Sequence, residues 1–258
     1  MRTASRVLLA LLVLVAVLTL ARRAIADERA EIEATIGSLR SKYNVQVHYV
    51  YSAEHYFPAR WRKTPISARG RQLALEEVTR LLPIIDRFLS AYPKRVLSDN
   101  LATIYLLSEL YLYDKSYGAT NSQSGLYIKS EGERKGFSDS FLLQRMHSEF
   151  SSILMRTHNF PEEDWRMANA ADFEYRGAGR EMLGETDLYG QTCGLLSQGF
   201  IVKYAQSSLE NDFNMISSWL FTDRDKLRHL GRTYPRIKAK TELAIEFYKS
   251  VDDRFDFR

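Results

Sequence analysis

The side chains best suited to chemistry lie close together in the middle of the chain. His147, Ser148, Glu149 and Ser152 occur within less than two turns of a helix. A glutamate can take a proton from water, and a histidine can transfer protons or bind a metal ion. The segment is therefore the first candidate for a catalytic or metal-binding site.

The surrounding residues, 138–155, have the pattern of an amphipathic helix with Ser138 as its N-cap. Its apolar positions are Leu142, Met146, Phe150 and Ile153. Successive residues of a helix are rotated by about 100°, so Ser148 and Ser152 share one face and His147 points away from it. His147 therefore cannot replace a ligand at position 148.

The spacing resembles a zinc-binding motif that has lost its ligands. In H-E-x-x-H, two histidines one turn apart bind zinc, and the glutamate activates a metal-bound water. Glu149 has the position of that glutamate, but Ser148 and Ser152 occupy both ligand positions. A serine hydroxyl stays protonated near neutral pH and seldom binds zinc. The alternative is an ordinary amphipathic helix, with His147 at the edge of the core and Glu149 as an exposed or capping acid.

A second block, residues 198–214, resembles the second signature of a zincin-type metallopeptidase family. In that signature, a Gly-Phe-x-x-x-Tyr-Ala stretch leads to a helix whose glutamate is the third zinc ligand. The stretch from Gly199 to Ala205 matches it, and alignment on Asp212-Phe213 places Asn211 at the ligand position. The nearest carboxylate, Glu210, lies one residue earlier.

Two residues of this block have alternative roles. Ser207 and Glu210 form an S-x-x-E pattern, which is typical of a capping box at the start of a helix. Tyr204 is a candidate to stabilise an oxyanion, and the alternative is an aromatic ring packed in the core. Asp212 and Asn214 are expected to be solvated residues of the helix.

Together the two blocks resemble the zincin-like, gluzincin-type zinc-binding metallopeptidases found mainly among bacterial exported proteins. The resemblance implies a zincin fold, in which an edge strand above the motif helix receives an extended peptide. It also implies Glu149 as the general base, and Glu210 as the third ligand if the register slips by one residue. Ser148, Ser152 and Asn211 are then degenerate ligand positions. A displaced site that uses His147 and His158 with Glu210 is a further alternative.

The N-terminus has the composition of a targeting segment. Arg2 and Arg6 precede an apolar run from Val7 to Ala21, and Ala24-Ile25-Ala26 offers a cleavage site. We expect residues 1–26 to be a signal peptide, with an uncleaved membrane anchor as the alternative, and residues 27–258 to form a single domain. The chain carries 36 basic and 32 acidic residues, and residues 1–26 contain four arginines and no acid. The remaining chain is therefore formally neutral, which argues against a nucleic-acid partner.

The rest of the sequence predicts an α+β fold. Helices are expected at residues 27–42, 70–92, 208–221 and 240–251, with Pro83 kinking or splitting the second. Strands are expected at residues 44–51, within 101–114, and at 126–129, the last pairing back on the strands before it. Residues 158–188 are expected to be irregular. This order predicts a small mixed sheet with a long helix, and a motif helix beneath an edge strand.

These observations predict an exported protein of the bacterial envelope, periplasmic or secreted. We expect it to resemble a zinc metallopeptidase but to bind zinc weakly or not at all, and to bind an extended peptide or protein in its cleft as a pseudo-enzyme. One alternative is an active metallopeptidase with Glu149 as base. Another is an envelope interaction protein without catalysis.

Overall fold

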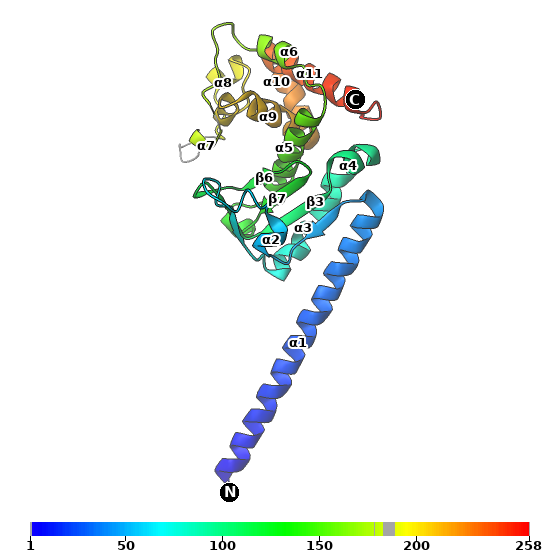
Figure 1. Ribbon diagram of the computed structural model, residues 1–258, viewed down its shortest axis with the longest axis vertical. Helices are drawn as coiled ribbons and strands as arrows, with labels where there is room; N and C mark the ends of the chain where they lie inside the picture. Colours follow the sequence, from blue (N-terminus) through cyan, green and yellow to red (C-terminus); the bar gives the residue numbers. More distant parts are fainter. Residues whose placement is uncertain (1, 178, 183–188, 258) are drawn as a thin grey trace.

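The structure is a computed structural model that describes residues 2–177, 179–182 and 189–257. The side chains of residues 2–16, 21, 180 and 181 lie outside this description. Helices and small sheets are combined in one chain, as the α+β prediction requires. Helix α5 (Asp139–Thr157) lies between the sheet and a group of C-terminal helices (Figure 1).

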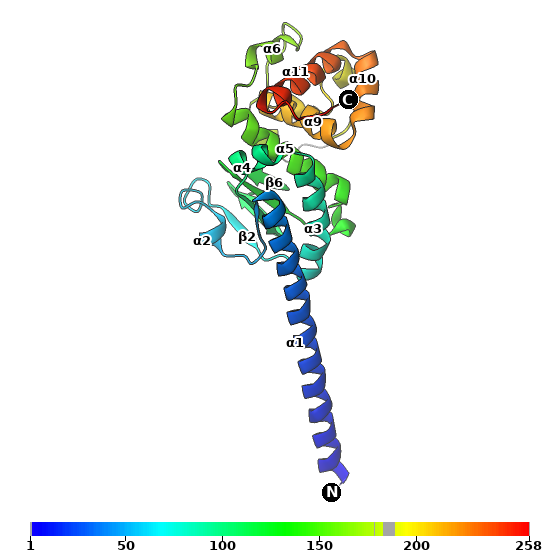
Figure 2. The same cartoon turned by 90° about the vertical axis from the view of Figure 1, so that its right-hand side faces the viewer.

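Helix α1 (Arg2–Tyr43) extends away from the rest of the molecule as a long rod (Figure 2). Only its last turns join the core, through buried side chains spaced three or four residues apart. These residues are Ile32, Ile36, Leu39 and Tyr43. In the part of the chain that the structure describes, no helix is long and apolar enough to cross a membrane.

The larger sheet has the strand order β1-β3-β7-β6. Its strands are β1 (Gln46–His48), β3 (Thr103–Leu107), β7 (Gly125–Lys129) and β6 (Ala119–Asn121). Strand β7 pairs with β3 in parallel and with β6 antiparallel, so the expectation that it pairs back holds only for its contact with β6. The short strand β6 therefore forms the edge of the sheet.

A smaller antiparallel sheet contains β2 (Arg69–Arg71), β4 (Glu109–Leu112) and β5 (Lys115–Ser116), in the order β2-β4-β5. Residues 101–114, where one or two strands were expected, contain the two strands β3 and β4. The short helix α2 (Ala53–Tyr56) contributes to an aromatic cluster beside this sheet, in which Tyr105 stacks on Tyr127.

Helices α3 (Leu75–Ser90) and α4 (Lys94–Asn100) belong to the same half of the molecule as the larger sheet. Pro83 lies inside α3, and the helix continues through it, so the expected split does not occur. The expected start at residue 70 is also wrong, because residues 69–71 pair with β4 instead. Helix α5 confirms the predicted motif helix and its cap, since the Ser138 hydroxyl accepts a hydrogen bond from the Phe141 amide at 3.3 Å.

The C-terminal half is helical. Helix α9 (Leu209–Thr222) packs along α5, and α10 (Arg224–Thr233) and α11 (Pro235–Val251) complete the group. The short helices of this half are α6 (Glu162–Met167), α7 (Gly179–Met182) and α8 (Cys193–Ser197), with a 3-10 turn, η2, at Lys203–Gln206. Another 3-10 turn, η1, lies at Glu133–Lys135, just before α5. The segment expected to be irregular thus contains α6 and α7, and residues 178 and 183–188 of it lie outside the described residues.

Candidate functional site

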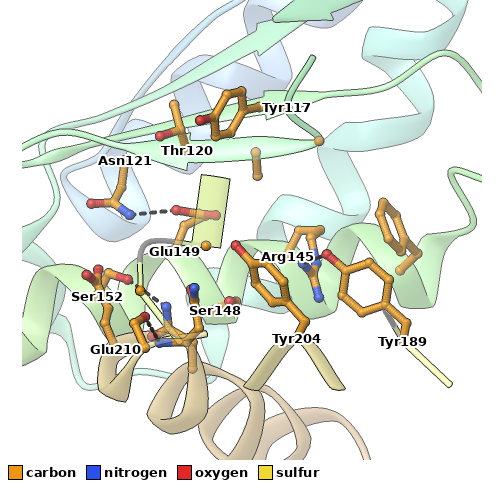
Figure 3. Close-up of a pocket in the computed structure, with 18 residues that line it drawn as sticks. Tyr117, Thr120, Asn121, Arg145, Ser148, Glu149, Ser152, Tyr189, Tyr204 and Glu210 are labelled. Carbon is orange, nitrogen blue, oxygen red and sulfur yellow. Dashed lines mark hydrogen bonds between the residues drawn. The ribbon is translucent and has the colours of Figure 1, made fainter. Parts of the chain in front are cut away.

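A cavity of about 660 Å³ lies between strand β6, helix α5 and the start of helix α9. Glu149, Ser148, Ser152, Asn211, Glu210 and Tyr204 all line it. Figure 3 shows the α5 residues below the strand, with Tyr204 reaching in from the side. The structure thus brings the two sequence blocks together, although more than 40 residues separate them in the chain. His147 is the candidate that it does not place there.

Glu149 points from α5 toward the edge strand. Its carboxylate accepts a hydrogen bond from the Asn121 side-chain amide of β6 at 2.5 Å. Burial raises the pKa of Glu149 to about 7, because a charged carboxylate loses hydration there, while the Asn121 hydrogen bond and the charge of Arg145 oppose the shift. A carboxyl group with a pKa near neutral pH is suited to proton transfer.

The two serine positions and Asn211 face the same cavity. Ser148 and Ser152 are almost fully buried, and the Ser152 hydroxyl accepts a hydrogen bond from the Asn214 amide group at 2.7 Å. The Asn211 amide group donates to the Ser207 hydroxyl at 2.8 Å. The three positions that the sequence resemblance assigns to zinc ligands thus carry two hydroxyls and an amide, and those of Ser152 and Asn211 form hydrogen bonds with neutral partners.

Glu210 lies at the rim of the cavity and is paired with a cation. Its carboxylate accepts a bond from Arg156 of α5 at 3.2 Å, and both side chains are partly exposed. The capping box predicted for Ser207 and Glu210 does not form. Instead, Ser208 is the N-cap of α9, and its hydroxyl accepts from the Asn211 amide N–H at 3.1 Å.

His147 lies in the core, on the other side of α5 from the cavity. Its Nδ1 atom is 2.7 Å from the Tyr92 hydroxyl, and its ring stacks on Phe221 with centroids 4.6 Å apart. Burial lowers the pKa of His147 to about 3, so the imidazole is neutral at physiological pH. The displaced site with His147 as a ligand is therefore not assembled: Glu210 is at the cavity rim, and His158 is hydrogen bonded to Asn100.

Tyr204 lies close to the backbone at the start of α7 as well as lining the cavity. A Cβ atom at Gly179 would overlap with the Tyr204 hydroxyl and with the Asn211 amide group, so a larger residue there would require these two side chains to shift. Burial raises the pKa of Tyr204 further above its usual value, which keeps the phenol protonated. The side chain can therefore donate a hydrogen bond into the cavity.

Helix α9 is fixed by a buried polar cluster next to the site. Asp212 accepts hydrogen bonds from Lys240 at 2.7 Å, Tyr175 at 2.8 Å and the Trp165 indole at 3.0 Å. The expectation that Asp212 and Asn214 are solvated is wrong, because both are buried. The cluster sets the position of α9, and with it the residues that α9 contributes to the cavity.

The side chains present do not fit a zinc ion. Zinc sites use imidazole, thiolate or carboxylate ligands, whereas the ligand positions here carry two hydroxyls and one amide. Among the residues that the structure describes, no group of three or more His, Cys, Asp or Glu side chains is placed to hold a metal ion. Glu149 and Glu210 alone would leave a zinc ion without nitrogen or sulfur ligands.

Sequence reasoning missed several residues of the cavity, among them Arg145 and three residues that contact other side chains of its lining. Asn121 bonds Glu149, Asn214 bonds Ser152, and Tyr189 contacts Arg145. Asn214 is the one with a usable signal, because it follows Asn211 by three residues and so shares its helix face. Asn121 and Tyr189 lie in short or irregular segments, where no periodicity indicates direction.

Comparison with known proteins supports the fold alone. No protein-family model matches the chain, and no curated protein matches it by sequence. Among solved structures, a protein from Bacteroides caccae ATCC 43185, described as a "putative zinc-binding metallo-peptidase", is similar with a TM-score of 0.58. The match covers 87% of this chain and 86% of that one, at 15% sequence identity. The two chains therefore share a fold, and this similarity does not show whether the present chain binds zinc.

Proposed function

We propose that this protein is a peptide-binding pseudo-enzyme built on a zincin-like metallopeptidase fold. In this proposal the cleft between β6 and α5 accepts an extended peptide, which pairs with the edge strand. The chain has lost zinc binding together with the zinc ligands, but it still binds peptides.

One observation carries the proposal. Glu149 lies in the same cavity as Ser148, Ser152 and Asn211, the three positions that align with zinc ligands. If α5 were an ordinary amphipathic helix, there would be no reason for Glu149 to line the same cavity as Asn211, the ligand position of the second sequence block. The similarity of fold to the Bacteroides caccae protein supports the same interpretation.

The edge strand supports the peptide as ligand. Among the strands that the structure describes, β6 pairs only with β7, and it lies above the cavity. An exposed strand edge can add a peptide strand through main-chain hydrogen bonds, with specificity from the side chains below it. Glu149, held by Asn121, then acts as a polar contact for the ligand.

Restoration of the ligands tests the lost zinc site. We expect the purified chain to retain no zinc after dialysis, and the variant Ser148→His/Ser152→His/Asn211→Glu to retain close to one zinc ion per chain. The melting temperature of that variant should fall when a chelator is added, whereas that of the wild type should not change. The double variant Ser148→His/Ser152→His with Asn211 intact is the matched control and should bind zinc more weakly.

Stoichiometric zinc in the wild type would contradict the proposal, above all if Glu210→Ala removed it. That result would instead favour an active metallopeptidase with Glu149 as base and Glu210 on the metal. We also propose export to the bacterial envelope, on the composition of residues 1–26. Recovery of the uncleaved chain, with its first residue still present, in the cytosolic fraction would overturn the proposal of export.

A further inference from the structure

Arg145 is a buried cation in the wall of the cavity. Its side chain is 9% exposed, and it lies on α5 one turn before Glu149. The central carbon of the guanidinium lies 5.4 Å from the ring centroid of Phe141 and 5.1 Å from that of Tyr189. Both distances are in the range of cation–π contacts, which favour a cation at this position.

Arg145 forms no ion pair with a carboxylate among the described residues, and Glu149 interacts with its charge only without direct contact. Its polar contacts are the Tyr189 hydroxyl at 3.3 Å and the Met215 sulfur at 3.9 Å, and its Nε atom is buried without a hydrogen-bond partner. By contrast, Arg156, later on the same helix, is paired with Glu210 of the cavity lining. An arginine removed from water is costly unless it is paired, so an unpaired one in a cavity wall indicates an anionic ligand.

The cleft has a direction, and Arg145 lies at one end of it. Asn121, Glu149 and Ser152 lie together at one end, whereas Tyr117, Arg145 and Tyr189 lie at the other (Figure 3). Strand β6 runs from the Arg145 end, where a Cβ atom added to the preceding Gly118 would lie 3.8 Å from the Phe141 ring, toward the Glu149 end, where Asn121 donates a hydrogen bond to Glu149.

The direction of β6 determines which end of a bound peptide meets Arg145. A peptide that pairs antiparallel with β6 runs from the Glu149 end to the Arg145 end, and therefore presents its carboxyl terminus to the guanidinium. A parallel peptide would bring its ammonium group to the same place, where two positive charges would repel one another. The antiparallel arrangement is the one that neutralises Arg145.

We infer that Arg145, with the Tyr189 hydroxyl beside it, is the binding site for the C-terminal carboxylate of a peptide in the cleft. The inference rests on the proposed peptide-binding function and specifies its ligand as a free chain end. A guanidinium binds a carboxylate through two parallel N–H···O bonds, which adds orientation to charge. Recognition would then require a free C-terminus and not an internal segment of a protein.

The test compares three libraries of short random peptides, retained on the immobilised full chain and identified by mass spectrometry. The first has free C-termini and no Asp or Glu, the second is the same library amidated, and the third is amidated but contains Asp and Glu. We expect retention of the first to exceed that of the second by about tenfold or more, because the second lacks the charge-assisted bond. The third library tests whether an acidic side chain can replace the terminal carboxylate. We expect its retention to be as low as that of the second.

Variants test whether Arg145 causes the preference for free C-termini. Arg145→Met should reduce retention of the first library to the level of the second, while Arg145→Lys should retain part of the preference. Arg156→Met is the matched control, a cation later on the same helix, and should preserve the preference. Melting temperatures of all variants show that each remains folded.

Each outcome decides between the two proposals. Equal retention of the free and amidated libraries, unaffected by Arg145→Met, would overturn the carboxylate site and leave the peptide function standing. Preferential retention of the third library over the first would assign Arg145 to an acidic side chain and overturn the terminal site. Retention of no library by the wild-type chain would overturn the peptide function itself.

Discussion

The two faces of helix α5 carry similar polar residues in very different surroundings. On the core face, His147 and Ser151 are buried and hydrogen bonded: Nδ1 of His147 with Tyr92, and Ser151 with the Tyr248 hydroxyl at 2.8 Å. On the cavity face, Glu149 and Arg145 line an open space, and Arg145 forms no ion pair with a carboxylate among the described residues.

The difference separates stability from binding on one helix. Polar groups of the core face are satisfied by the protein itself, so their replacement should affect folding. On the cavity face, Glu149 has a raised pKa and Arg145 has no ion pair among the described residues, so the burial of these two charges opposes folding. Each of the following changes tests this division, from the largest expected effect to the smallest.

His147→Ala should reduce the free energy of unfolding by about 3–5 kcal/mol, in the range measured for truncation of large buried rings. The ring packs between Phe88 and Phe221, and its loss leaves a cavity and an unpaired Tyr92 hydroxyl. Urea denaturation at neutral pH measures the change. A loss below about 1 kcal/mol would show that His147 is not part of the core.

The same histidine should make the protein sensitive to acid. The pKa of His147 is about 3 when folded and near 6.5 when unfolded, so the unfolded chain binds a proton first. Its stabilising contribution is complete above pH 6.5 and falls by about 1.4 kcal/mol per pH unit below it, or about 2 kcal/mol by pH 5. His147→Gln removes the titrating group, so its stability should decline less over this range. Parallel pH profiles of the two proteins would refute the assignment.

Glu149 should affect the pH dependence of stability in the opposite direction, and Glu149→Gln should remove this effect. The pKa of Glu149 is about 7 when folded and near 4.5 when unfolded, so its stabilising contribution is present below pH 4.5 and is lost as the pH rises through 7. We expect the variant to equal the wild type at pH 4 and to exceed its stability by about 1–3 kcal/mol at pH 8. Thermal unfolding at both pH values measures the difference. Lower stability of the variant at pH 8 would mean that the charged carboxylate supports the fold.

The two neighbouring serines provide the finest comparison. Ser151→Ala removes the Tyr248 partner in the closed core and should cost about 1–2 kcal/mol. Ser152→Ala removes the partner of Asn214 at the cavity wall, where water can replace the hydroxyl, and should cost less than about 1 kcal/mol. Chemical denaturation of both variants gives the order. Equal costs would mean that the two faces are equally closed to water.

The fold could be predicted in part because local patterns carry it. Helices α5, α9 and α11 follow from apolar residues at helical spacing, and strands β3 and β4 from β-branched and aromatic residues. Helix α10 was not anticipated, because its charged sequence buries only Leu227. The parallel pairing of β7 with β3 was also missed, since pairing between distant strands has no local signal.

For the site, the sequence by itself determined which way the side chains of α5 point. A rotation of about 100° per residue is enough to place His147 away from Ser148 and Ser152. Tertiary structure alone decided the partner of each side chain. Asn121 donates a hydrogen bond to Glu149, Arg156 forms an ion pair with Glu210, and no carboxylate among the described residues forms an ion pair with Arg145. These partners lie far apart in the chain, so packing and not periodicity brings them together. The sequence therefore predicted a degenerate ligand face on this helix, whereas the missing ion pair of Arg145 among the described residues became visible only in the structure.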